Sequence, residues 1–428
     1  MNRQAVRLIV SRSCFALALG STVTSAQDAP PTLSMGAHAI GLLTRATSTP
    51  EGRTLTEAYL TQPIVSADGR VAWFQAMGML NLEGFTLRRG ELDVGEWGEG
   101  YVDRRHPHAY VHELMVGAAT PLAPVAASLF AGRGFVPFGS DDPMSRPFVS
   151  YPVDHHLSQT LERLAVVSAV RARILLIEAA AFDGDEPLDP STPQLARRFG
   201  DSWSVRATLV RSLASLGDAE LSASYANVKS PEYREGQGMD QRKAHASFRV
   251  DANGRFSRYA LIEVARTTDV DHGRPLYTFN AALAEGALCH GGTGLAVRLE
   301  RSDRPEEERL LDLFRAARPA TDVSILGITQ WTTLSAAVAL PPRSLLSAHA
   351  APYVELARIR VDRTTAALFD PVRFYGSNLM WRTSVGLRFG IGHDHQREGR
   401  YGVAAAAPPS STNSPPHAHD MSSPSCFR

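Results

Sequence analysis

The chain has 428 residues with 44 basic and 44 acidic side chains, so its formal net charge is zero. A hydrophobic content of 44% and a charged content of 21% are ordinary for folded proteins and exclude a wholly disordered chain. The absence of a basic excess argues against nucleic acid as a partner, because proteins that bind it carry surplus positive charge. Only Lys229 and Lys243 are lysines, so arginine carries almost all of the positive charge.

The amino end has the three parts of a secretory signal peptide. Arg3 and Arg7 give a basic start, Cys14–Gly20 an apolar core, and Thr24–Ala26 a site of small residues for cleavage. We therefore expect residues 1–26 to be removed on export and residues 27–35 to form a short lead. The exported chain keeps two cysteines, Cys289 and Cys426, which is too few for a disulfide-stapled domain but allows a single bridge.

Alternation of apolar with polar or small residues at period two is the strongest pattern in the chain, and it predicts β-strands. It is clearest in residues 203–212, 244–252, 294–301 and 381–391. In the last of these runs, Trp381, Val385 and Phe389 alternate with Arg382 and Arg388. The runs are close to the length of about 9–11 residues that a tilted strand needs to cross a bilayer.

Short and long connections alternate between these strands. Short connections are expected at residues 66–70, 119–124, 171–173, 214–218, 252–255, 289–293 and 334–344. Long connections are expected at residues 83–107, 134–157, 184–200, 229–242, 268–275, 302–320 and 362–378. This alternation is typical of outer-membrane barrels, in which short periplasmic turns and longer external loops follow one another.

We therefore predict an all-β fold, a single antiparallel transmembrane β-barrel over residues 36–392. The count is about 16 strands, and it falls to about 14 without the weaker candidates at residues 36–45 and 55–65. Residues 393–428, rich in Ala, Pro and Ser, are expected to form a disordered tail. The alternative is an exported soluble β-rich binding protein, because a sandwich would show the same alternation with its polar face in water.

The chain resembles the outer-membrane porin class of Gram-negative bacteria. Its terminal strand, Leu379–Phe389, is similar to the C-terminal assembly signal of such barrels, in which alternating apolar residues end on an aromatic residue. The segment Gly132–Gly139 is loosely similar to the Pro-Phe-Gly region of phosphate-selective porins of the O and P type. The chain departs from the class by continuing past Phe389 to Arg428. The resemblance implies an outer-membrane location, with membrane lipid and the barrel assembly machinery as partners and small solutes as cargo. It does not define an oligomeric state.

A porin selects solutes through the charged side chains of its lumen. Strand parity predicts a pore-lining set of Arg206, Arg249, Arg298, Arg358, Arg360, Arg382, Arg388, Glu220 and Glu300. Because a guanidinium suits carboxylate and phosphate, the arginines favour passage of small anionic solutes. The alternative is that they pair with neighbouring acids and stiffen the wall.

Two long connections, residues 83–107 and 134–157, are candidates for a loop that folds into the pore. Their charged residues are the candidate constriction: Arg88, Arg89, Glu96, Asp103, Arg104, Arg105, Asp141 and Asp142. Both connections could equally be external loops whose charges cancel.

Three histidines, His106, His108 and His112, would share one face of a strand and form a candidate site for zinc, copper or nickel. Their spacing matches no closed structural zinc pattern, and surface histidines are common. No Gly-x-Ser-x-Gly elbow, His-Glu-x-x-His or phosphate-binding loop occurs, so neither an enzyme nor a cofactor is expected. A catalytic group assembled across strands from His108, His112, Asp154 and Ser158 remains as the alternative.

Overall fold

The computed structural model describes residues 31–49, 52–87, 110–121, 124–140, 143–160, 162–186, 196–213, 217–231, 236–252, 256–307, 325–345, 348–364, 369–392, 398–405 and 426–427. The expected signal peptide, residues 1–26, lies outside the described residues. None of the helices in the described part of the chain is long and apolar enough to cross a membrane.

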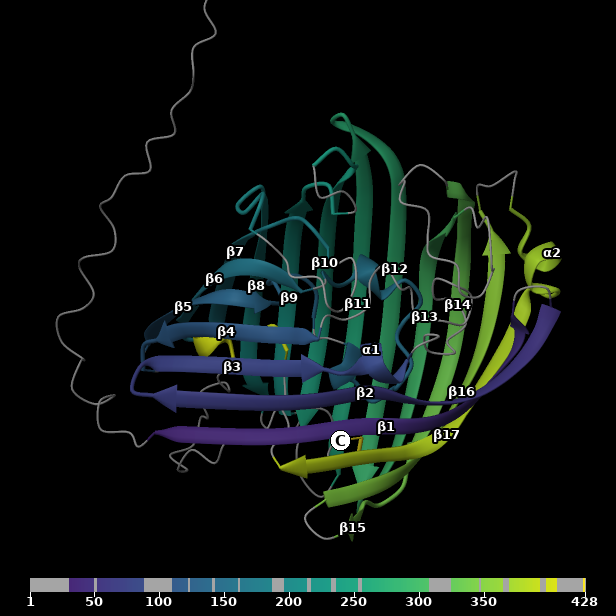
Figure 1. Cartoon of the computed structure of the whole chain (residues 1–428), viewed down its shortest axis with the longest axis horizontal. Helices are drawn as coiled ribbons and strands as arrows, with labels where there is room; N and C mark the ends of the chain where they lie inside the picture. Colours follow the sequence, from purple (N-terminus) through teal and green to yellow (C-terminus); the bar gives the residue numbers. More distant parts are fainter. Residues whose placement is uncertain are drawn as a thin grey trace, which may run out of the picture.

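Antiparallel strands make up most of the described chain (Figure 1). They are β1 (Thr32–Thr49), β2 (Arg53–Val71), β3 (Phe74–Asn81), β4 (Val111–Ala119), β5 (Val125–Gly134), β6 (Arg163–Ala172), β7 (Leu175–Phe182), β8 (Ser202–Leu213), β9 (Gly217–Val228), β10 (Asp240–Ala252), β11 (Ser257–Asp271), β12 (Arg274–His290), β13 (Thr293–Glu307), β14 (Ile325–Ala339), β15 (Arg343–Leu345), β16 (Ala348–Arg363) and β17 (Leu379–Gly392). Two short helices, α1 (Glu83–Thr86) and α2 (Pro371–Tyr375), lie in the connections after β3 and β16.

The sheet closes on itself. Each strand from β1 to β14 pairs with the next, β14 pairs with β16, and β16 pairs with β17. The seam is the β1–β17 ladder, which runs from Gly36 opposite Gly392 to Ala46 opposite Arg382. Because β15 only extends the β14–β16 connection, sixteen strands of the described chain form the barrel wall. The prediction of a 16-stranded barrel is confirmed, and a β-sandwich is excluded because one closed sheet has no second layer.

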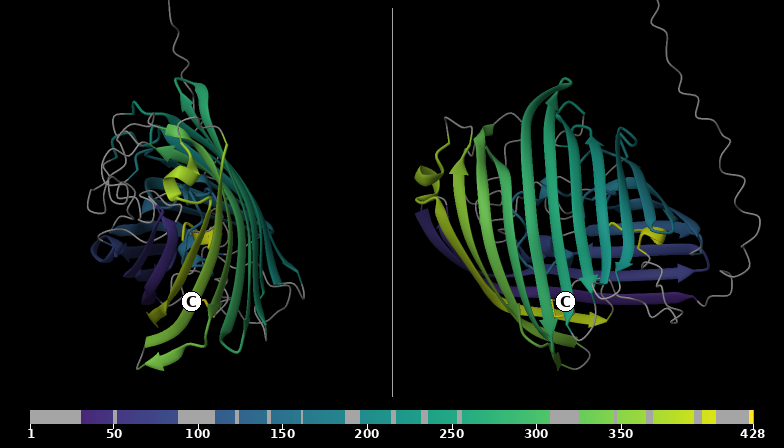
Figure 2. Two further views of the ribbon diagram at one scale, coloured as in Figure 1. Left: turned by 90° about the vertical axis from the view of Figure 1, so that its right-hand side faces the viewer. Right: turned by 180° about the vertical axis from the view of Figure 1, so that it is seen from behind.

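The alternation in the sequence separates the two faces of the wall as predicted. In β8, Trp203, Val205 and Leu209 are exposed, whereas Ser204, Arg206 and Thr208 are buried. The same division holds in β10, β13 and β17. Seen from behind, the long strands β8–β14 form one continuous wall (Figure 2). A closed ladder leaves no edge strand, so an apolar outer face and a polar inner face can coexist on one sheet.

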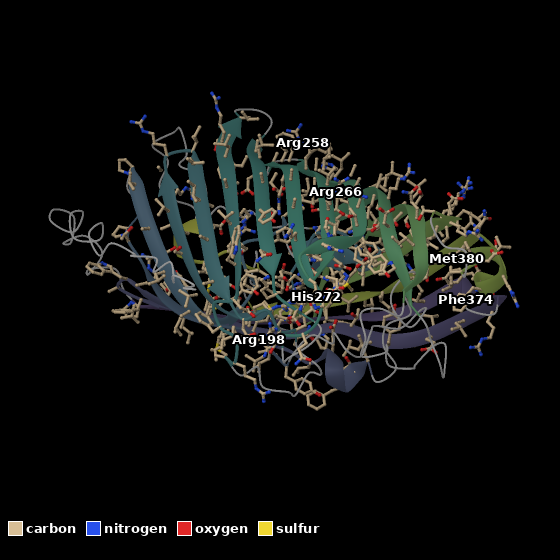
Figure 3. The ribbon with its side chains drawn as sticks, turned by 90° about the horizontal axis from the view of Figure 1, so that it is seen from above. Arg198, Arg258, Arg266, His272, Phe374 and Met380 are labelled. Carbon is tan, nitrogen blue, oxygen red and sulfur yellow. The ribbon has the colours of Figure 1, made fainter. Side chains whose placement is uncertain are left out.

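The outer face carries an apolar band bounded by arginines. On β11 the outward residues between Arg258 and Arg266 are Ala260, Ile262 and Val264, all exposed (Figure 3). At roughly 3.3 Å per residue the two arginines are about 26 Å apart along the strand. For a strand tilted by roughly 35–45°, this length covers about 18–21 Å of the membrane normal, slightly less than the apolar band of about 25 Å that surrounds a transmembrane barrel.

Four of the expected connections are wrong. The long connection expected at residues 302–320 begins later, because β13 continues to Glu307. Residues 66–70 lie inside β2, which continues to the turn Ala72–Trp73, because their backbone pairs with both β1 and β3. The long connection expected at residues 268–275 is the two-residue turn His272–Gly273, in which both residues have positive φ, as a type I′ hairpin requires. The short connection expected at residues 334–344 begins later, because β14 continues to Ala339.

The two ends of the barrel also differ from expectation. The first strand begins at Thr32, so the expected lead of residues 27–35 extends into the wall. The expected disordered tail contains two packed pieces, residues 398–405 and 426–427, whose side chains are mostly buried. These pieces pack because Tyr401, Val403 and Phe427 are apolar residues within an otherwise polar extension.

We predict that Ile262→Arg, a charge in the middle of the apolar band, destabilises the barrel in lipid vesicles by about 2–4 kcal/mol. Thr268→Arg, outward on the same strand but beyond Arg266, is the matched control and should cost at most about 1 kcal/mol. Reversible urea unfolding of the two variants in vesicles measures both values. Equal losses for the two variants would show that no bilayer surrounds this face.

Candidate pore constriction

The connection between β5 and β6 folds into the barrel. Its described residues, 135–140 and 143–160, have mostly buried side chains, and we call residues 135–160 the inserted loop. Two short 3-10 helices, Pro143–Ser145 and His155–Leu157, interrupt it. Phe148 and Val149 pack with Tyr259 and Leu283 of the wall, while Phe138 packs with Phe182. The described residues of the loop expected at residues 134–157 therefore lie against the inner face of the wall, and their role as a constriction stays a prediction.

The first attachment of the inserted loop is at Gly139, beside β8 and β9. The backbone N–H of Gly139 donates to Ser224 Oγ at 3.0 Å, and its carbonyl oxygen accepts from Arg206 Nη1 at 3.3 Å. Gly139 has a φ of +79°, and a Cβ there would lie 2.1 Å from the carbonyl oxygen of Ser158. Glycine is thus needed at the end of the Gly132–Gly139 segment both for the backbone conformation and for contact between the two arms of the loop.

Arg146 and Glu263 attach the middle of the inserted loop to β11. Arg146 Nη1 lies 2.8 Å from Glu263 Oε1, and Arg146 Nη2 lies 3.2 Å from Oε2, so the pair is bidentate. Ser140 Oγ donates to the same carboxylate at 2.7 Å, and His245 Nε2 lies 3.2 Å from it. The carboxylate raises the pKa of Arg146 above its ordinary value, although burial opposes this rise. Both partners are buried, so removal of one would leave the other charge uncompensated.

Glu355 of β16 binds the next turn of the inserted loop. It accepts from the Val149 N–H at 3.1 Å, from Tyr353 OH at 2.5 Å and from Arg382 Nη2 at 2.9 Å. It also contacts the hydroxyl of Ser150. One buried carboxylate thus joins two neighbouring strands to the loop.

Two arginines on nearby strands of the same part of the wall hold the backbone of the loop. Arg298 donates to Glu285 at 2.7 Å and to the Ser150 carbonyl oxygen at 2.7 Å, and its guanidinium lies 4.3 Å from the centre of the Phe148 ring. Arg388 Nη2 donates to the Pro147 carbonyl oxygen at 2.8 Å. These contacts extend the attachment of the loop to β13 and β17.

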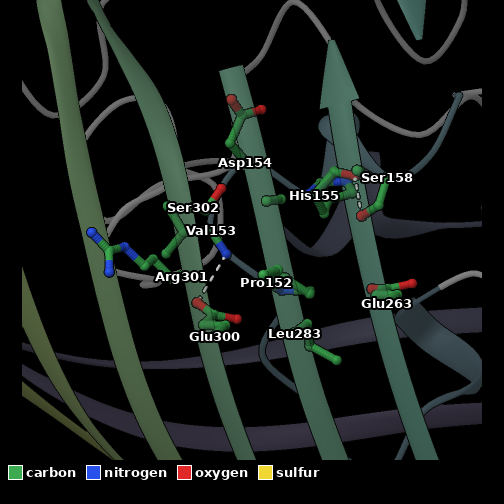
Figure 4. Close-up of a pocket in the computed structure, with 13 residues that line it drawn as sticks. Pro152, Val153, Asp154, His155, Ser158, Glu263, Leu283, Glu300, Arg301 and Ser302 are labelled. Carbon is green, nitrogen blue, oxygen red and sulfur yellow. Dashed lines mark hydrogen bonds between the residues drawn. The ribbon is translucent and has the colours of Figure 1, made fainter. Parts of the chain in front are cut away.

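A narrow pocket lies between the end of the inserted loop and β11–β13 (Figure 4). Glu300 faces it and accepts from the Val153 N–H at 3.2 Å, and Asp154, His155 and Glu263 also line it. Further contacts continue around the wall, because Lys243 Nζ donates to the His156 carbonyl oxygen at 2.7 Å. The pocket thus has three carboxylates, those of Asp154, Glu263 and Glu300, beside the guanidinium of Arg301 and several small or apolar side chains.

A second segment, residues 398–405, lies inside the barrel beside β4–β9. Arg400 Nη1 lies 3.0 Å from Glu178 Oε2, and Arg206 binds the same carboxylate at 2.7 and 2.8 Å. Tyr401 OH accepts from the Phe135 N–H at 2.9 Å, which ties the segment to the inserted loop. Burial and the nearby carboxylate of Glu113 raise the pKa of Tyr401 well above its ordinary value.

The predicted pore-lining residues divide into two groups. Those that are buried on the inner face are Arg206, Arg249, Arg298, Arg382, Arg388, Glu220 and Glu300. Arg358 and Arg360 instead lie on the outer face with Val354 and Leu356, because the buried residues Tyr353, Glu355 and Ala357 set the parity of β16. Their placement in the lumen was therefore wrong.

Four of the inner arginines are paired with carboxylates, and Arg388 donates to the backbone carbonyl oxygens of Phe427 and Pro147. Arg249 contacts Asp251 of its own strand, Arg298 contacts Glu285, Arg382 contacts Glu355, and Glu220 lies 3.9 Å from Arg400. The alternative that the arginines stiffen the wall is thus supported by their contacts.

Most of the other candidates cannot be placed. Arg88, Arg89, Glu96, Asp103, Arg104, Arg105, Asp141 and Asp142 lie outside the described residues, as do His106 and His108. His112 is buried in β4, with one ring nitrogen facing Glu162 and the other 3.2 Å from Glu398. Within the described ranges, no group of three or more His, Cys, Asp or Glu is arranged to hold a metal ion.

The residues that organise the site beyond the sequence-based set are acids: Glu178, Glu263, Glu285 and Glu355. Each occupies an inward position of an alternating strand. The same parity that selected the arginines could have selected them. Residues 398–405 gave no such signal, because they lie outside any strand.

No family model matches the chain, and no curated protein matches it. Among solved structures it is similar to an anion-selective porin from Comamonas acidovorans, with 10% identity, a TM-score of 0.48, and coverage of 85% of this chain and 100% of that one. It is also similar to the outer-membrane-expressed OmpT of Vibrio cholerae, with 9% identity, a TM-score of 0.49, and coverage of 84% and 98%. The outer-membrane channel DcaP of Acinetobacter baumannii has 11% identity, a TM-score of 0.46, and coverage of 86% and 98%. Similarity at this level defines no family for the chain.

We predict that Gly139→Ala displaces the inserted loop, because the new Cβ would overlap the Ser158 carbonyl oxygen. Gly200→Ala is the matched control, since Gly200 has a φ of +88° with no atom within 4 Å of an added Cβ. The free energy of unfolding of the control should fall by only about 1–2 kcal/mol, which is the cost of the left-handed backbone conformation for a residue other than glycine. Thermal unfolding in detergent should show the larger loss for Gly139→Ala, and equal losses would contradict close packing at this position.

Proposed function

We propose that the protein is an outer-membrane channel for passive, weakly selective passage of small hydrophilic solutes. The observation that carries this proposal is the combination of a closed wall, apolar outside and polar inside, with a loop attached across the lumen. The outward apolar band fits a lipid surrounding. The expected signal peptide supports export, and we propose that the barrel assembly machinery then inserts the protein into the outer membrane of a Gram-negative-type bacterium. The inserted loop then sets the width of the passage.

The ion preference follows from the pairing of the inner charges. Arg206, Arg298 and Arg382 each bind a carboxylate, so they add little net positive potential. Among the described buried side chains, carboxylates outnumber arginines and lysines, and three carboxylates line the pocket beside Glu300 together with Arg301. We therefore propose weak selectivity without the anion preference that the arginines alone suggested.

A catalytic role is not part of this proposal. The ring of His112 faces two carboxylates, and Ser158 Oγ donates to the His155 carbonyl oxygen at 3.4 Å. His112 and Ser158 thus have different partners, and the serine has no adjacent base among these contacts.

We expect purified protein in planar bilayers to give discrete current steps. In a salt gradient, the reversal potential should lie near zero or slightly on the cation side, because the inner arginines are neutralised. A strongly anion-selective reversal potential would contradict the neutralisation, and a membrane that never shows current steps would contradict an open channel. Heat-modifiable migration on a gel confirms in the same samples that the barrel is folded.

We also predict that Glu263→Gln widens the passage, because Arg146 loses its carboxylate and the inserted loop loses its central attachment. The single-channel conductance should rise and fluctuate more than in the unmodified protein. Asp251→Asn is the matched control, since it removes a buried carboxylate from an ion pair within β10. The same conductance in both variants would show that the Arg146–Glu263 pair does not hold the constriction.

A further inference from the structure

The carboxyl end of the chain lies inside the barrel. Cys426 and Phe427 are each 1% exposed, although the wall already ended at Gly392. The Phe427 carbonyl oxygen accepts from Arg388 of β17, and the ring packs in the same buried cluster as Phe148 and Val149 of the inserted loop. The end of the chain is therefore a third element of the lumen, beside the inserted loop and residues 398–405. Figures 1 and 2 place it near the ends of β12 and β17.

The wall has a recess that fits these two residues. Cys289 is buried on the inner face of β12 and pairs in register with Gly294 of β13. A Cβ at Gly294 would lie 2.4 Å from the Phe427 ring and 2.8 Å from Cys426 Cβ, so any larger residue there would expel the end of the chain. The absence of a side chain at Gly294 thus gives space in which the two cysteines meet.

The two thiols are in contact. The structure holds Cys289 and Cys426 as buried thiols, and their side chains are within hydrogen-bonding distance of each other. They are the only cysteines that remain after removal of residues 1–26, and they come from segments far apart in the sequence. Exported proteins enter compartments in which such pairs are oxidised.

We infer that Cys289 and Cys426 form a disulfide bond that fixes the carboxyl end of the chain inside the lumen. The oxidant is a protein disulfide of the export compartment. One cysteine thiolate attacks that disulfide and forms a mixed disulfide, and the second thiolate then displaces the oxidant. The new S–S bond takes the place of two thiols, and the oxidant leaves as a dithiol carrying both electrons and both protons.

The bond would give the part of the chain after β17 a second fixed point. Residues 398–405 are attached beside β4–β9, whereas Cys426 lies against β12 and β13 on another part of the wall. The structure thus assigns residues 398–405 and 426–427 the role of permanent parts of the lumen, where they narrow the proposed channel.

Peptide mapping tests the bond directly. Trypsin releases Cys289 in residues 267–298, because Arg274 precedes proline, and releases Cys426 in residues 401–428. Protein isolated from the outer membrane should be unfolded under acid, blocked with an alkylating reagent and digested without reductant. Unfolding precedes blocking because burial raises the pKa of the Cys426 thiol and slows its alkylation in the folded state. The expected result is a linked pair of these two peptides that reductant separates. Recovery of both peptides in alkylated form would overturn the inference.

A second measurement tests the consequence for the lumen and does not depend on the mapping. Cys289→Ser, Cys426→Ser and the double variant should show the same rise in conductance fluctuations, since each removes one bond, and reductant should give the unmodified protein the same behaviour. Additive effects of the two single substitutions, or no effect of any of them, would overturn the anchoring role. If the protein forms no channel at all, the proposed function fails, while the peptide mapping still decides whether the bond exists.

Discussion

The β1–β17 ladder is the constraint on which the rest of the structure depends. A strand with an unpaired edge cannot lie in hydrocarbon, because each bare N–H or C=O group costs several kcal/mol. Once Gly36–Ala46 pairs with Arg382–Gly392, every strand has two neighbours and the sheet acquires an inside and an outside. Parity along each strand then decides the environment of each side chain. The apolar band, the charged lumen and the space for inserted segments all follow from this closure.

Closure also imposes a requirement on the lumen. The inserted loop and residues 398–405 bury the inner face, so each charged side chain on this face needs a nearby partner of opposite charge. The compensation is local: Glu263 binds Arg146, Glu355 binds Arg382, and Glu178 binds both Arg206 and Arg400. These pairs serve simultaneously as neutralisation and as attachment points. The same residues that make the interior polar therefore also determine where the inserted segments attach to the wall.

The fold could be predicted from the sequence because period-two alternation is a local property. It can be recognised within one strand without knowing which strands lie beside it. The wall, its strand number and the inward position of Arg206 and Arg298 were predicted in this way. Strand parity placed Arg358 and Arg360 in the lumen wrongly, because alternation does not by itself tell which of the two faces of a strand is turned inward. At the rim of the outer face, arginine is equally stable in water and lipid headgroups. The turn at His272–Gly273 was missed because a His-Gly pair indicates only weakly that both residues will adopt the positive φ values of a two-residue hairpin turn.

The site was less predictable than the wall. The presence of the inserted loop could be inferred from its length, but its partners could not, since Arg146 and Glu263 are brought together only by closure. Residues 398–405 follow no periodic pattern, and their burial depends on Tyr401 and Arg400 meeting a wall built from β4–β9. Sequence patterns thus identify strands, in which burial alternates regularly from residue to residue. They miss single residues whose contacts come from strands that are distant in the sequence.

The position of Phe427 couples the inserted loop to the last strand of the wall. Phe427 follows β17 in the sequence, yet its ring is buried in the same cluster as Phe148 and Val149 of the inserted loop. Its carbonyl oxygen accepts from Arg388, and the same guanidinium donates to the Pro147 carbonyl oxygen. A displacement of either segment would therefore reach the other through one side chain of β17.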